Sequence, residues 1–304
     1  MTLFLEQLLN GMQLGVTLFL LAAGLTLIFG IMGVINLAHG SIYMIGAYAG
    51  TYVAATTGSF LLGIPAGLAA AALTGIAVEF LVVRQLYDRD HLDQVLATFG
   101  LILIFNQAIT MIFGRQPLFV GLPEALSGSV ELLPGLFYPL YRLAIIAVGL
   151  LVAVGLYLLI NRTRVGMLVR AGSTNREMVR ALGVDIRLLY TAVFALGALL
   201  AGLAGYMAGP ILAVQVGMGE QILITTFVVV VIGGVGSVKG AFYASLLLGV
   251  TDTALRAYLP GLLRQVMVGP EADALGAGIS SMGIYLLMAI VLLIRPKGLF
   301  AGST

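Results

Sequence analysis

The chain has 304 residues, of which 61% are hydrophobic and only 9% are charged, whereas a typical soluble domain carries about 25% charged residues. The formal net charge of +2 is too small to indicate a nucleic-acid-binding protein, and the absence of cysteine excludes disulfides and thiol chemistry. A chain this apolar needs lipid as its solvent. We therefore expect one transmembrane domain, residues 1–304. The N-terminus lacks a basic segment and a small-residue cleavage site, which favours a retained first span.

Apolar runs that approach the roughly 20 residues of a bilayer crossing recur along the chain. They are continuous rather than alternating, which favours helices over a barrel. The candidate spans are 8–30, 41–57, 61–83, 95–113, 139–160, 189–208, 222–238, 240–258 and 281–294. The sequence therefore predicts an all-α polytopic helical bundle of about nine transmembrane spans, between eight and ten. We detect no internal repeat.

The stretch "GVINLAHGSIYMIGAYAG", residues 33–50, follows the first span and places Asn36 and His39 in an otherwise apolar, glycine-rich run. Gly40 permits backbone turns that larger residues resist. Two interpretations stay open. Asn36 and His39 satisfy backbone groups where the helix breaks, since lipid offers no water to do so, or they line the translocation path or its inner gate.

Other polar residues in or near the spans are few. Asn106, Thr225 and Thr226 are candidates for the path, with interhelical hydrogen bonds as the alternative. Glu79 with Arg84, and Asp252 with Arg256, favour paired structural roles near span ends. Three G-x-x-x-G spacings predict close helix contacts: Gly46/Gly50, Gly63/Gly67 and Gly205/Gly209.

The segment 161–188 is rich in arginine and is predicted to be a cytoplasmic loop. Within it, Thr174 and Glu177 fit a capping box and Gly183 fits the position that ends a helix, so we expect a short helix at about 175–182. So short a helix is marginal alone and must pack on its own bundle, lipid headgroups or a partner protein. With nine spans, this orientation places the N-terminus outside.

The same orientation divides the remaining basic residues between the two sides of the membrane. The residues expected inside, besides those of 161–188, are Arg84, Arg89, Lys239, Arg295 and Lys297. The residues expected outside are Arg115, Arg142, Arg256 and Arg264.

Three motifs together resemble the permease subunits of branched-chain amino acid ABC importers, the LivH type. They are "GVINLAHGSIYMIGAYAG", "RAGSTNREMVRALGVDIRLLY" and "VVVVIGGVGSVKGAFYASLLLG", in that order along the chain. The resemblance implies that the second motif docks a cytoplasmic ATPase, although Val179 stands where alanine is expected. The docking residues would be Arg170, Thr174, Asn175, Arg176, Glu177, Arg180 and Gly183. The path or gate residues would be Asn36, His39, Gly40, Asn106, Thr225, Thr226, Gly233, Gly234 and Gly236.

The resemblance also implies the assembly: two cytoplasmic ATPase subunits, a second permease subunit that is identical or different, and a periplasmic solute-binding protein in a bacterial inner membrane. The chain has no P-loop, since "GGVGSVKG" lacks the G-K-[ST] ending, so ATP and Mg would be used by the partner ATPase. No catalytic residue, metal site or bound cofactor is predicted. Besides branched-chain amino acids, the candidate solutes are urea, short amides and aromatic acids. An ion-coupled secondary transporter or channel is a rival, and an intramembrane enzyme a weaker one.

Overall fold

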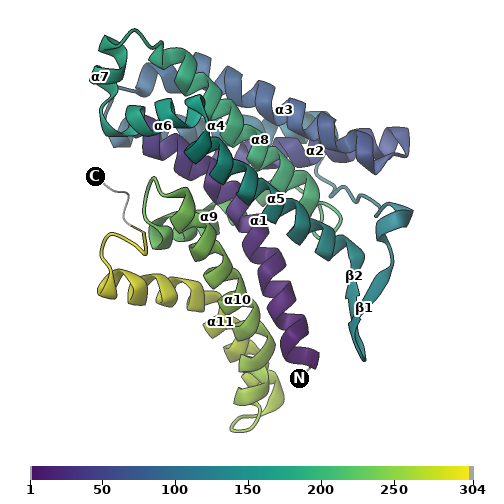
Figure 1. The fold of residues 1–304 in the computed structure, drawn as a ribbon. Coiled ribbons are helices and arrows are strands. Elements are labelled where there is room, and N and C mark those ends of the chain that lie inside the picture. The colour runs from purple at the N-terminus through teal and green to yellow at the C-terminus, as the bar shows by residue number, and fades with distance from the viewer. Residues whose placement is uncertain (1, 301–304) are drawn as a thin grey trace.

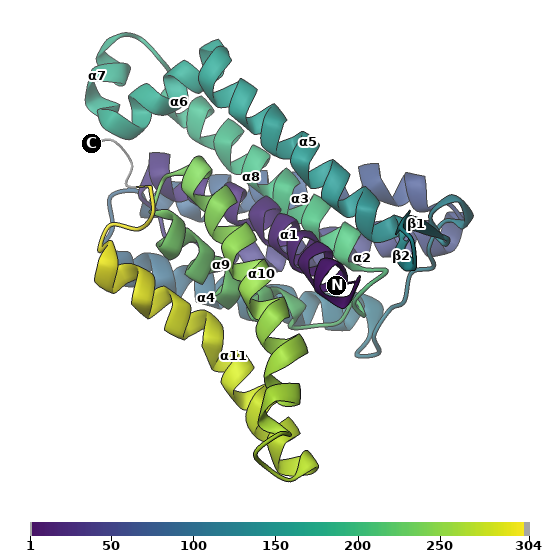
Figure 2. The same ribbon diagram turned by 60° about the horizontal axis from the view of Figure 1, so that its bottom comes forward.

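A computed structural model describes residues 2–300, and these residues form a bundle of helices with one small hairpin (Figures 1 and 2). The long helices are α1 (Thr2–Met32), α2 (His39–Thr57), α3 (Phe60–Leu81), α4 (His91–Phe113), α5 (Leu140–Arg162), α8 (Ile186–Ala208), α9 (Met218–Gly233), α10 (Val238–Leu263) and α11 (Gly269–Ile294). The short elements are η1 (Val83–Leu86), η2 (Glu124–Leu126), β1 (Ser129–Leu133), β2 (Leu136–Pro139), α6 (Arg164–Thr174) and α7 (Arg176–Ala181).

The all-α class is confirmed, but the predicted count of nine spans is too high. Among the described residues, six helices are long and apolar enough to cross a membrane: α1, α3, α4, α5, α8 and α11. The count rises to seven if α9 and α10, bent by 119° at the break between them, form one span. The predicted spans 222–238 and 240–258 are thus the two arms of this bent pair. The predicted span 41–57 corresponds to α2, which is rich in Gly, Tyr and Thr and is not among the six.

Helix α1 runs through the centre of the bundle and is the most buried of the spanning helices (Figure 1). Its glycines allow other backbones to approach. A methyl group built on Gly11 would lie 2.6 Å from the Cα of Val250 in α10, and one on Gly24 would lie 2.7 Å from the carbonyl oxygen of Gly197 in α8. In lipid, such small-residue contacts replace the hydrophobic drive that packs soluble helices.

Helices α2, α3 and α8 pack together in the same way, and the G-x-x-x-G spacings meet there. A methyl group on Gly46 would lie 2.4 Å from the Cα of Gly202, and one on Gly67 would lie 2.7 Å from the carbonyl oxygen of Gly46. Gly63 lies against the Tyr206 side chain, whose hydroxyl donates to the carbonyl of Phe60 at 2.7 Å. The predicted close contacts are confirmed for these helices.

The structure contains an internal repeat that the sequence does not display. In α1–α4, a long helix is followed by a break and then by three helices, and α8–α11 repeat this order. Helices α1 and α8 run in opposite directions, because Tyr190 near the start of α8 donates to the carbonyl of Ile31 near the end of α1. The packing is reciprocal as well: α1 packs on α10 as α8 packs on α3, and α2 packs on α9. Inverted repeats of this kind place a binding site at the interface of the two repeats in many transporters.

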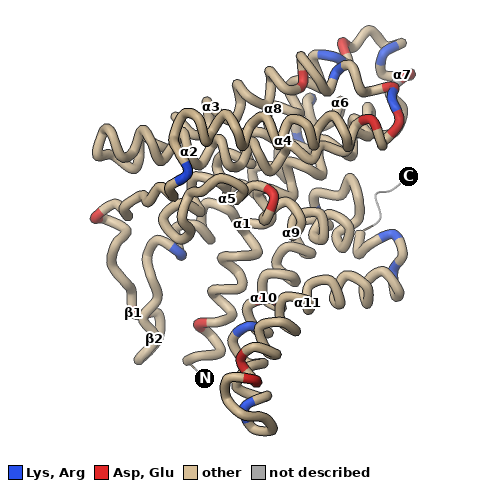
Figure 3. The backbone as a smooth tube through the Cα atoms, turned by 180° about the vertical axis from the view of Figure 1, so that it is seen from behind, with Lys and Arg blue, Asp and Glu red and all other residues tan. Residues whose placement is uncertain are grey.

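The charged residues lie mainly at the two ends of the bundle (Figure 3). One end holds α6, α7, the turn after α3 and the residues after α11, and the other holds the N-terminus, the β1–β2 hairpin and the α10–α11 turn (Figure 1). The predicted ion pairs are confirmed: Arg84 lies 3.0 Å from Glu79 and Arg256 lies 2.9 Å from Asp252. We refer to the end with α6 and α7, which the sequence predicts to be cytoplasmic, as the inner end.

Candidate coupling surface and translocation path

The arginine-rich segment 161–188 is helical rather than a loop with one short helix, since α6 precedes α7. Helix α7 is shorter than the predicted 175–182, and its cap is Asn175, whose side chain accepts a hydrogen bond from the N–H of Met178 at 2.9 Å. The capping box on Thr174 is therefore wrong. Thr174 is the last residue of α6, and its hydroxyl donates to the carbonyl of Arg170 at 3.0 Å. Among the described hydrogen bonds, none joins the Glu177 carboxylate to the backbone of Thr174.

The end of α7 agrees with the prediction. Gly183 has φ of +83°, a left-handed conformation that glycine adopts at low cost. The chain therefore reverses directly after α7 and enters α8, which Asp185 caps through the N–H groups of Arg187 and Leu188. The short helix is held by defined caps at the start of α7 and at the start of α8.

Helix α7 presents apolar and basic side chains outward. Met178 is 59% exposed and Leu182 is 75% exposed, and Arg180 between them is exposed. Val179 faces inward and is 4% exposed, so it anchors α7 to the bundle. Arg170 donates to the carbonyl of Ile160 and thereby fastens α6 to α5. The Arg176 side chain lies outside the described part of the structure. We call the exposed surface of Met178, Arg180 and Leu182 the coupling surface.

A cleft of about 520 Å³ lies between the coupling helices and the inner end of α1. It brings together three of the predicted docking residues with residues far away in the sequence. Its lining residues are Gly30, Ile31, Gly33, Asp88, Gly172, Ser173, Thr174, Asn175 and Glu177. The cleft thus places α6 and α7 beside the end of α1.

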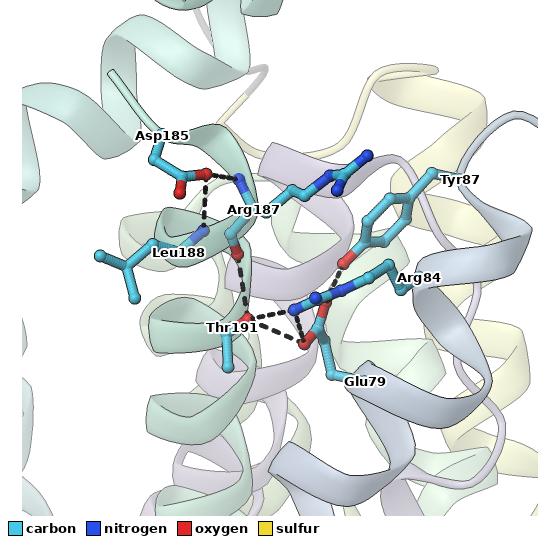
Figure 4. A network of polar contacts seen from close by, with 7 residues as sticks. All are labelled: Glu79, Arg84, Tyr87, Asp185, Arg187, Leu188 and Thr191. Atoms are coloured by element: carbon cyan, nitrogen blue, oxygen red, sulfur yellow. Dashed lines mark hydrogen bonds and ion pairs between the residues drawn. The ribbon is translucent and has the colours of Figure 1, made fainter. Parts of the chain in front are cut away.

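A polar network around the buried Glu79 joins α3, the turn after it and α8 (Figure 4). Glu79 is fully buried, and its carboxylate accepts hydrogen bonds from Arg84 at 3.0 Å and 3.2 Å and from the Thr191 hydroxyl at 2.8 Å. Tyr87 also donates to Glu79. Burial, and then the hydrogen bond to Glu79, raise the pKa of Tyr87 above its ordinary value, so the phenol stays protonated. The network ties the helix that follows α7 to the first repeat.

The first break, residues 33–38, lies between α1 and α2 and is stabilised by side chains. The side chain of Asn36 accepts from the N–H of Ala38 at 3.0 Å, and the His39 ring nitrogen Nε2 lies 3.2 Å from the carbonyl oxygen of Leu21 in the middle of α1. Asn36 and His39 are both fully buried. These contacts favour the structural interpretation, and a role in the path or gate stays a prediction.

Two side chains of α4 complete the first break. Gln94 accepts from the N–H of Ile35 at 3.1 Å, and the Thr98 hydroxyl accepts from the N–H of Leu37 at 3.3 Å. Gln94 and Thr98 are 2% and 0% exposed. Buried backbone groups need such partners, because each unsatisfied N–H costs about 1–3 kcal/mol.

The second break, residues 209–217, lies between α8 and α9 and leads to a different environment. Its backbone pairs with Leu118 through Val214, with N–H to oxygen distances of 2.8 Å and 3.0 Å. Glu220 then follows in the first turn of α9, and it accepts a hydrogen bond from the Asn106 side chain of α4. Both residues are half-buried. The predicted path residue Asn106 thus has a charged partner from the other repeat.

The remaining predicted path residues occupy two places. Thr225 is half-buried on α9, and the buried Thr226 donates to the carbonyl of Ile222 at 2.7 Å. Gly233, Gly234 and Gly236 lie at the inner end, where they form the sharp bend between α9 and α10. The N–H of Phe300 donates to the carbonyl of Gly233 at 3.1 Å. The structure does not bring these glycines together with Asn106, and their role in a gate stays a prediction.

The two breaks meet at one point. A methyl group built on Gly40 would lie 2.3 Å from the carbonyl oxygen of Gly219, and one built on Gly219 would lie 2.3 Å from the carbonyl oxygen of Gly40. The starts of α2 and α9 therefore touch, backbone against backbone, inside the bundle. The contact is symmetric with respect to the two repeats.

Sequence reasoning missed Glu220, Gln94, Thr98 and Thr191. One signal was available for Glu220, which is the only acidic residue between Asp185 and Asp252. No comparable signal marks Gln94, Thr98 or Thr191, because their partners are far away in the sequence.

Several apolar helices long enough to cross a membrane, an inverted repeat with breaks that meet inside it, and a short capped helix at one end are features of a multi-pass membrane permease. A family model described as the branched-chain amino acid transport system permease component matches residues 7–294. The chain belongs to this family, as the resemblance implied. It is therefore a permease subunit of a transport system.

Curated relatives agree with the family. The chain is 29% identical to the high-affinity branched-chain amino acid transport system permease protein BraD of Pseudomonas aeruginosa, over 97% of this chain and 95% of that protein. It is 27% identical to the corresponding permease LivH of Escherichia coli K12, over the same shares. It is also 26% identical to the fructose import permease protein FruF of Bifidobacterium longum, over 84% of this chain and 69% of that protein. No solved structure matches.

Proposed function

We propose that this chain is the permease subunit of a binding-protein-dependent ABC importer for branched-chain amino acids or related small neutral amino acids. The names of BraD and LivH, which cover nearly the whole chain, support this substrate class. Urea, short amides and aromatic acids are the alternative solutes. The chain would lie in the bacterial inner membrane, with a second permease copy or a related permease, and it would receive its solute from a periplasmic binding protein.

The observation that carries the mechanism is the coupling surface. Two exposed apolar side chains flank an exposed arginine on a short, capped helix, which suits insertion into a groove of an ATPase subunit. Two cytoplasmic ATPase subunits would bind and hydrolyse ATP with Mg, and their movement would reach α1 through the cleft and α8 through the Glu79 network.

The orientation is tested by labelling. The chain contains no cysteine, so Arg180→Cys and Val266→Cys each introduce a single thiol, at exposed positions on opposite ends of the bundle. A membrane-impermeant maleimide applied to intact cells should label Val266→Cys only. Labelling of Arg180→Cys from outside would overturn the proposed mechanism.

Coupling is tested in vesicles that contain the permease, the ATPase subunits and the binding protein. Leu182→Glu places a charge on the coupling surface and should lower ATP-driven leucine uptake more than tenfold, together with the amount of co-purified ATPase. Val266→Glu, a matched change at the outer end, should leave both unchanged.

Gly183→Pro and Glu177→Lys should uncouple ATP hydrolysis from uptake while the protein stays inserted, because proline does not adopt the positive φ of residue 183. Normal uptake in all three coupling variants, or uptake driven by an ion gradient without ATP, would overturn the proposal.

A further inference from the structure

The junction of α4 and α9 carries a polar cluster at the depth of the apolar spans. Asn106 and Gln107 are consecutive on α4, and Glu220 and Gln221 are consecutive on α9. At 1.5 Å per residue, Asn106 lies about 22 Å from the start of α4 and about 10 Å from its end. Glu220 lies about 20 Å from the bend that ends α9. We call these four residues the central cluster.

The central cluster is too polar to be stable against lipid. Gln107 and Gln221 are exposed on the surface of the chain, although both are adjacent to the half-buried pair of Asn106 and Glu220. Polar and ionisable side chains at this depth face a bundle interior or a water-filled cavity, because lipid offers them no hydrogen bonds. The exposed side of the α4–α9 junction therefore suits polar surroundings rather than lipid.

The carboxylate of Glu220 can accept further hydrogen bonds. Asn106 donates to one oxygen, Oε1, while the other, Oε2, is buried and has no hydrogen-bond partner among the described residues. Each described salt bridge uses another acid: Glu79, Asp252 or Asp273. A carboxylate oxygen that is withdrawn from water is stabilised by a positively charged partner. The position therefore favours a cationic group brought from elsewhere.

We propose that Glu220, oriented by Asn106, binds the ammonium group of the transported amino acid in the translocation path. This inference rests on the proposed function and adds a recognition residue to it. One oxygen of the carboxylate is held by Asn106, and the other receives an N–H of the ammonium. Gln107 and Gln221 offer further hydrogen bonds to the solute. The apolar side chain of the solute passes along the exposed apolar residues nearby, Leu103 on α4 and Ile224 on α9.

The decisive variant is Glu220→Gln, which keeps the size and the hydrogen bond from Asn106 but removes the charge. In vesicles with the ATPase subunits and a leucine-loaded binding protein, we expect leucine imported per ATP hydrolysed to fall at least tenfold, with the stimulated ATPase activity retained. Glu220→Asp should recover part of the uptake. Glu271→Gln, which neutralises an exposed acid at the start of α11, is the control and should behave as the unaltered protein.

A second measurement separates recognition from a structural role. Isoamylamine keeps the side chain and ammonium of leucine without its carboxylate, and isocaproate keeps the side chain and carboxylate without the amine. Isoamylamine should slow uptake by the unaltered protein and have no effect on the residual uptake of Glu220→Gln, while isocaproate should have no effect on either. Leucine binding to the binding protein is measured in parallel, so that competition there is subtracted.

Each outcome decides the inference. A Glu220→Gln variant that imports leucine at the unaltered rate, or that stays sensitive to isoamylamine, overturns it. Equal sensitivity of the unaltered protein to isoamylamine and isocaproate also overturns it. Failure of the proposed function looks different, since the unaltered protein would then show no ATP-driven leucine uptake. Fructose import that survives Glu220→Gln would indicate a sugar permease, as in the relative FruF.

Discussion

The backbone breaks twice at equivalent places of the inverted repeat, and the two breaks are built differently. At the first break, the N–H groups of Ile35, Leu37 and Ala38 each have a side-chain partner, and the accepting side chains, Gln94, Thr98 and Asn36, are buried. At the second break, the chain enters α9 with a half-buried carboxylate beside an exposed glutamine. The same topology thus provides a dry frame on one side and a wet surface on the other.

The difference assigns separate tasks to the two repeats. The first break is fixed by Gln94 and Thr98 of α4, whose next polar residues, Asn106 and Gln107, belong to the wet surface. Helix α4 therefore connects the frame to the path. Changes in the frame should lower stability and leave the transport rate of folded protein intact. Glu220→Gln should instead lower the transport rate and leave stability intact.

The contact that joins the two breaks is expected to tolerate change least. In Gly40→Leu the new side chain collides with the backbone of Gly219, which has no flexible atoms to move away. We expect destabilisation of more than about 4 kcal/mol and loss of folded protein. The measurement is the yield of monodisperse protein in detergent.

The matched control is Gly155→Leu in α5, where a helical glycine has no atom within 4 Å of an added Cβ. It should give a normal yield, because its side chain extends into open space. A normal yield for Gly40→Leu would show that the starts of α2 and α9 do not touch as described.

Loss of a frame side chain should have the second-largest effect. In Gln94→Leu, the N–H of Ile35 and the carbonyl of Arg89 lose their side-chain partner, while the carbonyl of Leu86 keeps the N–H of Arg89. We expect a loss of about 3 kcal/mol, since each unsatisfied buried group costs about 1–3 kcal/mol. The chain has neither Trp nor Cys, so thermal unfolding is followed by far-ultraviolet circular dichroism.

Gln265→Leu, in the exposed turn after α10, is the control and should not change the midpoint of unfolding. Leucine uptake per folded Gln94→Leu molecule should remain within twofold of the unaltered protein. A variant that unfolds normally but transports poorly would contradict the division between frame and path.

The sequence predicts much of this architecture and little of the site. Continuous apolar runs identify the helices, and the glycine spacings identify where α2, α3 and α8 touch, because both depend on local composition. The span count fails at α9 and α10, since hydropathy does not report the bend of 119° between them. The capping box fails because Asn175 competes with Thr174 for the same helix start.

The site could not be predicted for a further reason. Glu220 and Asn106 are 114 residues apart, and Thr191 and Glu79 are 112 apart. Without an alignment, no pattern in the sequence reveals such pairs. The isolated acid at position 220 was visible, but its partner and its exposure depend on how the two repeats meet.

The smallest expected effect tests a single hydrogen bond of the frame. The Thr98 hydroxyl accepts from the N–H of Leu37 and donates to the carbonyls of Gln94 and, at longer distance, Val95, so Thr98→Val removes these bonds at nearly constant volume. Thr110→Val on the same helix is the control, because Thr110 donates only to the carbonyl of Asn106. We expect Thr98→Val to lose about 1 kcal/mol more than Thr110→Val, the cost of leaving the N–H of Leu37 unsatisfied. Equal unfolding midpoints would mean that water reaches the first break, and the contrast between a dry and a wet break would then fail.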